Sequence, residues 1–230
     1  MRPGQLSLAA LLATAMPLAA GGQSVVVDEG TFAVTIAGQS AGSESFTIRR
    51  AGIGSDAVVV ANAVVRIDTA EGATELRSLL ETLLPDGAAS KYQLKITGAE
   101  TGDVTLALAG RRFVSLIRTQ RGEEEREFLA RPETRIIEEG VAHHYHFLGA
   151  VREGSAAPVL EPRTRRQIRL VASAWVDQTL DLGPTQVTAR RVVFTAGEEE
   201  RIVWFDRQGR VLRLEIPSRS FVAERTDLVG

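Results

Sequence analysis

The feature that most constrains this chain is an alternation of apolar and polar residues that recurs along most of its length. Near the start, Phe32 and Val34 share one face of an extended chain, and shortly afterwards Phe46 and Ile48 do the same. An alternation with a period of two residues is typical of a strand with one face buried. The intervening residues are glycine, serine and glutamine, which favour a turn. We therefore predict a β-hairpin over residues 31–50.

The same rhythm continues toward the C-terminus. Tyr92, Leu94 and Ile96 alternate with polar residues, and residues 201–216 form a hairpin pattern whose loop carries Gly209. Roughly ten to thirteen short strands at this spacing are typical of a sandwich or barrel. Alternating strands and helices do not occur, which argues against a parallel sheet. We predict a mainly all-β fold, in which a single curved antiparallel sheet forms a half-barrel or partly open barrel with at most one or two short helices.

Residues 74–84 are the best helix candidate in the chain. Leu76, Leu79 and Leu80 recur at helical spacing. The rival interpretation is a strand that places Ser78 on the same face as Leu76 and Leu80. We favour the helix over the strand at this point.

The N-terminal segment predicts export from the cell. Residues 1–23 combine Arg2 with an apolar run over 6–20 and small residues after it. This is the pattern of a secretory signal peptide. We expect the remaining residues, 24–230, to form a single antiparallel β domain that is periplasmic or secreted, with an irregular loop at 151–164. No other stretch is apolar enough to span a bilayer, so we do not expect a transmembrane protein.

Composition excludes several kinds of protein. The chain has no cysteine, which excludes disulfides, cysteine-ligated zinc, iron–sulfur clusters and a cysteine nucleophile. A net charge of −2 with 44% hydrophobic residues indicates a folded globular protein and argues against a nucleic-acid partner. No glycine-rich phosphate loop occurs, so we expect no cofactor. Gly38-Gln39-Ser40-Ala41-Gly42 matches G-x-S-x-G in letters, but it lies between two predicted strands and no helix follows it, so it is not a nucleophile elbow.

The three histidines are clustered in one short stretch, as His143, His144 and His146. Two imidazoles on one strand face are compatible with a metal pair, but a zinc site needs a further ligand such as Glu138 or Glu139. We favour a structural role over a metal site and expect a polar, hydrogen-bonded end of a loop or short helix. We assign neither a metal ligand nor a catalytic residue here.

Asp68-Thr69-Ala70 resembles the carboxylate turn of retroviral-type aspartic proteases. That chemistry needs two such carboxylates that share a proton. The Glu71-Gly72 continuation departs from the usual small apolar residues. An enzyme therefore ranks behind the binding roles considered below.

Two hairpins carry a family resemblance. Residues 30–51 and the run from Val203 to Glu215 resemble the first and last hairpins of uncharacterised bacterial periplasmic proteins. We associate that group with the curved antiparallel half-barrel of the lipoprotein-localisation carriers. The resemblance implies a concave face that holds acyl chains, and it assigns a role to no individual residue.

The leading hypothesis is a soluble periplasmic binding or carrier protein that holds a lipid or another apolar small molecule on the concave face of the sheet. A twisted sheet of this size curls, and its concave side must be filled by side chains, a helix or a ligand. The candidate ligand-binding residues are Phe32, Val34, Phe46, His144, His146 and Trp204.

The alternative hypothesis is a non-enzymatic envelope scaffold or interaction module, with an envelope protein as its partner and a packed barrel core. A filled concave face without a cavity above about 300 Å³ favours this alternative. Both hypotheses leave the ligand and the oligomeric state open.

Overall fold

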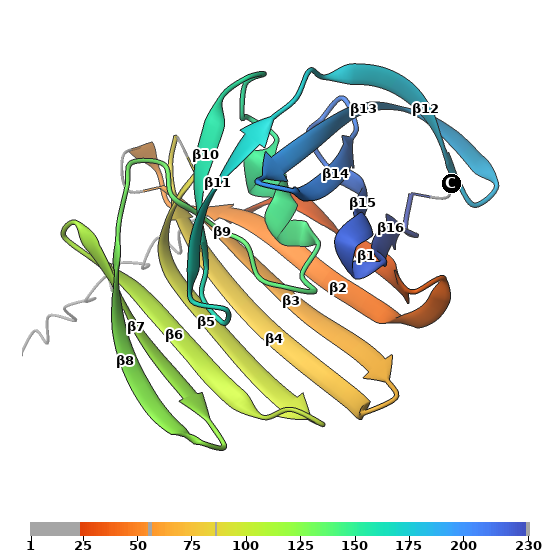
Figure 1. Cartoon of the computed structure of the whole chain (residues 1–230). Coiled ribbons are helices and arrows are strands. Elements are labelled where there is room, and N and C mark those ends of the chain that lie inside the picture. The colour runs from red at the N-terminus through yellow and green to blue at the C-terminus, as the bar shows by residue number, and fades with distance from the viewer. Residues whose placement is uncertain (1–23, 55–56, 86, 229–230) are drawn as a thin grey trace, which may run out of the picture.

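The computed structural model describes residues 24–54, 57–85 and 87–228, and its strands belong to one sheet (Figure 1). The signal peptide that we predict at residues 1–23 lies outside the described residues. The strands of the first half are β1 (Val25–Ile36), β2 (Gln39–Ala51), β3 (Val58–Thr69), β4 (Gly72–Leu83), β5 (Ala88–Gly98), β6 (Gly102–Ala109), β7 (Arg112–Thr119) and β8 (Gly122–Leu129).

The second half contributes shorter strands and two short 3-10 helices. The strands are β9 (Arg135–Ile136), β10 (Ala156–Glu161), β11 (Arg166–Ala172), β12 (Val176–Leu182), β13 (Thr185–Ala196), β14 (Glu199–Phe205), β15 (Val211–Ile216) and β16 (Phe221–Arg225). The 3-10 helices are η2 (His143–Leu148) and η3 (Pro217–Arg219).

Strand β1 lies in the middle of the sheet, not at its edge. Strand β1 pairs with β2 on one side and with the last strand, β16, on the other. From there the sheet runs through β2 to β8 in one direction and through β16 and β15 back to β9 in the other, with β12 paired to β13 off this path. The pairings are antiparallel apart from the parallel pair of β9 and β10. This arrangement confirms the predicted antiparallel class.

The sheet curls until its two ends approach each other without closing into a barrel (Figure 1). The amide of Ala89, in β5, donates to the carbonyl of Thr134, just before β9, over 2.8 Å. The side-chain amide Nε2 of Gln167, in β11, donates to the Leu129 carbonyl, in β8, also over 2.8 Å. Because β8 and β9 remain the two ends of the strand order, the structure is the predicted partly open barrel.

The concave side of the sheet is filled by the chain itself. Residues 137–148 run through the interior and end in η2, whose residues are nearly all buried. The side chains of Ile137, Val141, Tyr145 and Leu148 are each 2% exposed or less and belong to the main apolar core. Fully burying side chains of this size contributes about 1.5–3 kcal/mol each. The interior segment, as we call residues 137–148, is therefore part of the core.

Two sequence predictions are wrong. Residues 74–84 fall mostly in strand β4, because β4 is paired along its length with both β3 and β5. The inward face of β4 carries Leu76, Ser78 and Leu80, all buried, as in the rival interpretation. The stretch 151–164, which we expected to be irregular, contains β10.

Candidate functional site

Four of the six predicted ligand-binding residues lie deep in the main core. Phe32, Val34, Phe46 and His144 are at most 5% exposed. The rings of Phe32 and Phe46 are stacked, with centroids 5.2 Å apart, and Phe46 in turn stacks on His143 at 5.6 Å. These side chains contact the chain's own residues, and their role as ligand contacts stays a prediction.

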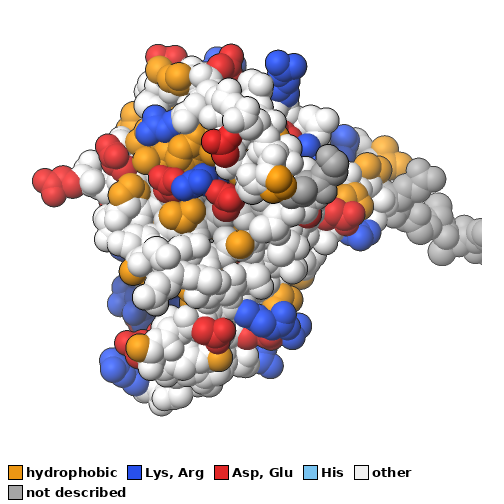
Figure 2. Space-filling model, turned by 90° about the vertical axis from the view of Figure 1, so that its right-hand side faces the viewer, with side chains coloured by type: hydrophobic (Ala, Val, Ile, Leu, Met, Phe, Trp, Pro, Cys, Tyr) orange, Lys and Arg blue, Asp and Glu red, His pale blue; other side chains and the backbone are white. Residues whose placement is uncertain are grey.

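The structure does not bring Trp204 together with that group. Its ring belongs to a second apolar cluster with Leu180 and Leu212. The guanidinium carbons of Arg191 and Arg213 each lie 5.7 Å from the centre of its ring. Figure 2 faces the side of the molecule from which the β12–β13 hairpin projects, and hydrophobic side chains gather there with charged ones among them.

His146 is the most exposed of the three histidines. Its ring stands edge-on to Phe147, with centroids 5.4 Å apart. Burial lowers the pKa of His146, which keeps the ring neutral near pH 7. The histidines lie in the short helix η2, one of the two structures, a loop or a short helix, that we predicted for them. Within the described residues no three histidine or acidic side chains gather closely enough to hold a metal ion.

A fully buried carboxylate fixes the start of η2. Glu44 is 0% exposed, and its two oxygens accept hydrogen bonds from the amides of Ala142, at 2.6 Å, and His143, at 3.0 Å. His143 Nδ1 also lies 2.6 Å from Glu44 Oε1. Because a carboxylate in an apolar interior must have partners, Glu44 ties the interior segment to strand β2.

A second buried carboxylate, Glu138, sits where the interior segment enters the barrel. Its oxygens accept hydrogen bonds from the Tyr92 hydroxyl, at 3.3 Å, and from Arg163 Nε, at 3.0 Å. Its own amide donates to His144 Nδ1 over 3.1 Å. The histidine therefore accepts at Nδ1, and burial holds its pKa well below 6.5. Burial also raises the pKa of Glu138, while the nearby Arg163 acts against that rise.

Beside Glu138 the barrel is open. A pocket of about 460 Å³ lies at this end, and we call it the mouth pocket. Its apolar walls are side chains at or near the ends of β1, β3, β4, β15 and β16 that point to the inside of the sheet. These residues are Ile36, Ile67, Leu76, Ile216 and Phe221.

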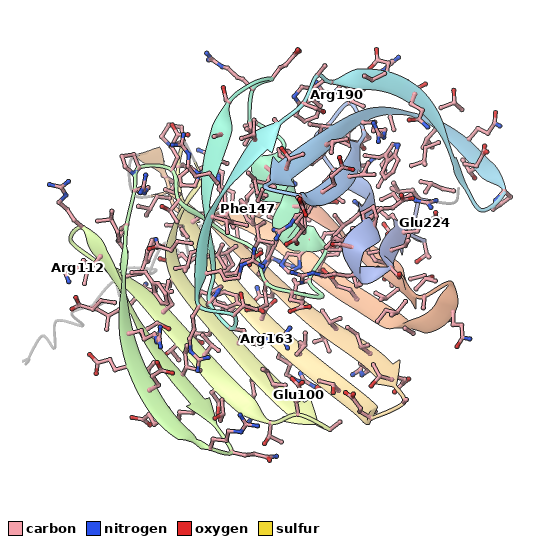
Figure 3. The ribbon with its side chains drawn as sticks, in the orientation of Figure 1. Glu100, Arg112, Phe147, Arg163, Arg190 and Glu224 are labelled. Atoms are coloured by element: carbon pink, nitrogen blue, oxygen red, sulfur yellow. The ribbon has the colours of Figure 1, made fainter. Side chains whose placement is uncertain are left out.

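The rim of the mouth pocket is charged. It carries Glu100, Glu139, Arg163 and Arg219. Arg219 Nη1 lies 2.8 Å from Glu139 Oε1, and Arg163 reaches inward to Glu138. Figure 3 shows Arg163 and Glu100 toward this end of the sheet, with Phe147 farther from it. An apolar pocket with a few polar groups at its edge is the usual form of a small-molecule site.

A larger hollow, of about 720 Å³, crosses strands β2 to β6. The exposed residues in its lining are polar, with Asn62, Gln93, Lys95 and Thr105 among them, while Val64 and Leu79 add half-buried apolar surface. This hollow lies over the outward side chains of the sheet and is more open than the mouth pocket. The mouth pocket is the better candidate because it enters the barrel beside a buried network of ionisable groups.

Sequence reasoning missed the residues that build this site. Glu44 lies two residues before Phe46 and therefore shares its inward face. A charged residue at a core position of an alternating strand is a signal of a buried polar contact, and it could have identified Glu44. Glu138 was considered only as a metal ligand. Arg163 was interpreted mainly as part of a solvated sheet face, with an arginine-lined rim for an anionic headgroup or an acidic partner as the lesser alternative. Their contact joins positions 25 residues apart, which periodicity does not reveal.

Comparison with known proteins identifies the fold. No family model and no curated protein matches the chain. Among solved structures, the chain is similar to a β-barrel-like protein of the domain of unknown function DUF1849 from Brucella abortus. The match has a TM-score of 0.52 over 86% of this chain and 94% of the other, with 10% identity.

The fold is β-barrel-like. At this level of identity the likeness concerns the fold alone, so the function of a β-barrel-like chain must be argued from its own pockets. The relation to the lipoprotein-localisation carriers stays a prediction. Within the described residues, no helix is long and apolar enough to cross a membrane.

Proposed function

We propose that this protein binds a lipid or another apolar small molecule in the mouth pocket, as a periplasmic or secreted binding or carrier protein. The observation that carries the proposal is an apolar pocket of about 460 Å³ at the open end of a curved sheet. Ligand pockets of proteins typically measure about 300–1,000 Å³ and have mainly apolar walls. The predicted signal peptide at residues 1–23 supports the location.

The position of the ligand differs from our sequence-based expectation. The middle of the concave face holds the interior segment, whose Tyr145 and Leu148 are buried. A ligand in the mouth pocket therefore contacts the inward residues nearest the open end, such as Ile67 and Phe221. Removing the apolar part of a ligand from water supplies the affinity.

A scaffold role is the second candidate. It is favoured by the filling of the concave face by residues 137–148, since a packed interior needs no ligand. The two proposals differ in what the mouth pocket does. Binding requires it to take up an apolar molecule, whereas a scaffold leaves it filled with water.

The test uses the full chain and the neutral dye Nile red, whose fluorescence rises in apolar surroundings. Thr74 lines the mouth pocket and is half-buried, so Thr74→Trp should fill the pocket and weaken binding by at least about tenfold. Thr188→Trp is the matched control, because Thr188 is exposed on the β12–β13 hairpin.

Lipid extraction and mass spectrometry of the purified protein form the second arm of this test. We expect a co-purifying amphiphile in the wild type that is depleted in Thr74→Trp. Absence of any ligand, together with Nile red binding that both variants leave unchanged, would overturn the binding proposal in favour of the scaffold.

A further inference from the structure

A second pocket adjoins the mouth pocket and is lined by arginines. It has a volume of about 420 Å³, and we call it the arginine pocket. Arg118 and Arg121 come from the β7–β8 hairpin, and Arg163 and Arg165 come from the turn between β10 and β11. Two turns that are distant in the sequence thus present four guanidinium groups to one hollow.

The two pockets share part of their lining. Ala99, Glu100 and Arg163 line both of them. The lining of the arginine pocket also includes the buried side chains Ile96 and Ile117. A molecule that occupies the mouth pocket can therefore extend a polar end past Arg163.

The charge of the arginine pocket is strongly one-sided. Its lining holds four arginines and a single carboxylate, Glu100. By contrast, the mouth pocket has three carboxylates and two arginines in its lining. A hollow lined by one sign of charge concentrates ligands of the opposite sign.

Three of the four arginines remain able to take a new partner, whereas Arg163 is bound to the buried Glu138. Arg118 pairs with Glu123, and Arg165 with Glu124, on surfaces that are more than a third exposed. Exposed pairs of this kind are worth about 0–1 kcal/mol and are easily exchanged. Within the described part of the chain, Arg121 has no carboxylate within ion-pair distance.

The backbone supports the placement of one of these groups. Arg165 has a φ of 59°, in the left-handed region that side chains other than glycine, asparagine and aspartate rarely adopt. Such conformations cost free energy and often occur where a turn positions a functional group. Here the conformation holds Arg165 in the lining of the arginine pocket.

We infer that the ligand of this protein is an amphiphile with an anionic head, a carboxylate or a phosphate, whose head lies in the arginine pocket and whose apolar chain lies in the mouth pocket. This inference rests on the proposed function, because it assigns the apolar chain to the mouth pocket. Guanidinium groups recognise both heads through paired, charge-assisted hydrogen bonds.

The test compares probes that share one apolar chain. Dodecanoate, dodecyl phosphate and the neutral dodecyl maltoside are titrated into the full-length protein below their micellar concentrations, with inorganic phosphate as a head without a chain. We expect the better anionic probe to bind at least about tenfold more tightly than the maltoside, which corresponds to the lower end of the range for one charge-assisted hydrogen bond. The comparison of dodecanoate with dodecyl phosphate shows whether the pocket prefers a carboxylate head or a phosphate head.

Arg121→Gln should remove most of that preference and leave binding of dodecyl maltoside unchanged. Arg111→Gln is the matched control, since Arg111 is an exposed arginine in the β6–β7 turn at the opposite end of these strands. Both variants should keep the wild-type circular dichroism spectrum and thermal midpoint.

The possible failures are distinguishable. Equal affinities for the three dodecyl probes, unaffected by Arg121→Gln, would overturn the anionic-head inference and leave the mouth pocket in place. Anionic binding that is sensitive to Arg121→Gln but not to Thr74→Trp would remove the chain from the mouth pocket. If no dodecyl probe binds while Nile red binding stays sensitive to Thr74→Trp, the anionic-head inference fails and the proposed binding function stands. If Nile red does not bind the mouth pocket either, both proposals fail.

Discussion

Two buried carboxylates hold the interior segment, and they differ in their access to solvent. Glu44 and its partner His143 are both 0% exposed, so the pair is sealed within the core. Glu138 is also buried, but its partner Arg163 is 24% exposed at the side chain and lines both pockets. We infer that the first pair fixes the fold, whereas the second couples the fold to whatever occupies the mouth.

Removal of the sealed carboxylate, Glu44, should cause the largest loss of stability and is the strongest test of this difference between the two pairs. Glu44→Ala leaves the amides of Ala142 and His143 without their acceptors inside the core. We expect a loss of about 3–5 kcal/mol in the free energy of unfolding, because a buried partner remains unpaired. Urea unfolding measures this loss. Glu44→Gln keeps one acceptor oxygen and should lose less, and a loss below about 1 kcal/mol in the alanine variant would contradict the structural role.

A smaller effect is expected at the mouth. Arg163→Met keeps the length of the side chain but deprives Glu138 of its Nε hydrogen bond. Because the mouth admits water, we expect the free energy of unfolding to fall by only about 1–2 kcal/mol. Arg165→Met is the matched control, since it breaks an exposed pair with Glu124 and should cost less than about 0.5 kcal/mol. Equal losses in the two variants would contradict the role of Arg163.

The smallest effect is a pH dependence that belongs to Glu138. Burial raises the pKa of this carboxyl above its ordinary value of 4.5. Between 4.5 and the raised value, the folded protein holds more protons than the unfolded chain, so stability falls as pH rises. Glu138→Gln lacks this titration. Its stability relative to wild type should therefore improve with rising pH across that window.

The measurement is urea unfolding of both proteins at a series of pH values. Arg163 opposes the rise in the pKa of Glu138, so Arg163→Met should widen the window toward higher pH. Parallel stability curves for wild type and Glu138→Gln would show that Glu138 is not the titrating group.

Alternation predicted most strands because it reports which side of a strand is buried. It failed at β4, where Leu76 and Leu80 fit a helix and a strand equally well. Pairing with β3 and β5 decided the outcome, and a local pattern does not contain the neighbours of a strand. For the same reason β10 was missed, since Pro158 made its segment resemble a loop.

The candidate site was less predictable than the fold. The sequence indicated a polar loop or short helix at the histidines, and η2 is a short helix there. It did not indicate that the helix enters the barrel, because the contacts that place it, such as Glu44 with His143, join residues 99 positions apart. Pockets built from the ends of several strands depend on how the sheet curls, and no single segment carries that information.

The pairing of β1 with β16 has a consequence for how this chain is made. The free edge of β1 has no partner strand until β16 has been synthesised, so the pairing that joins the two halves in the middle of the sheet forms late. Contacts of such long sequence separation form slowly and leave strand edges open to association in the meantime. A chain that stops before residue 221 would present β1 and β15 as two bare edges, so loss of a few terminal residues would expose the middle of the molecule.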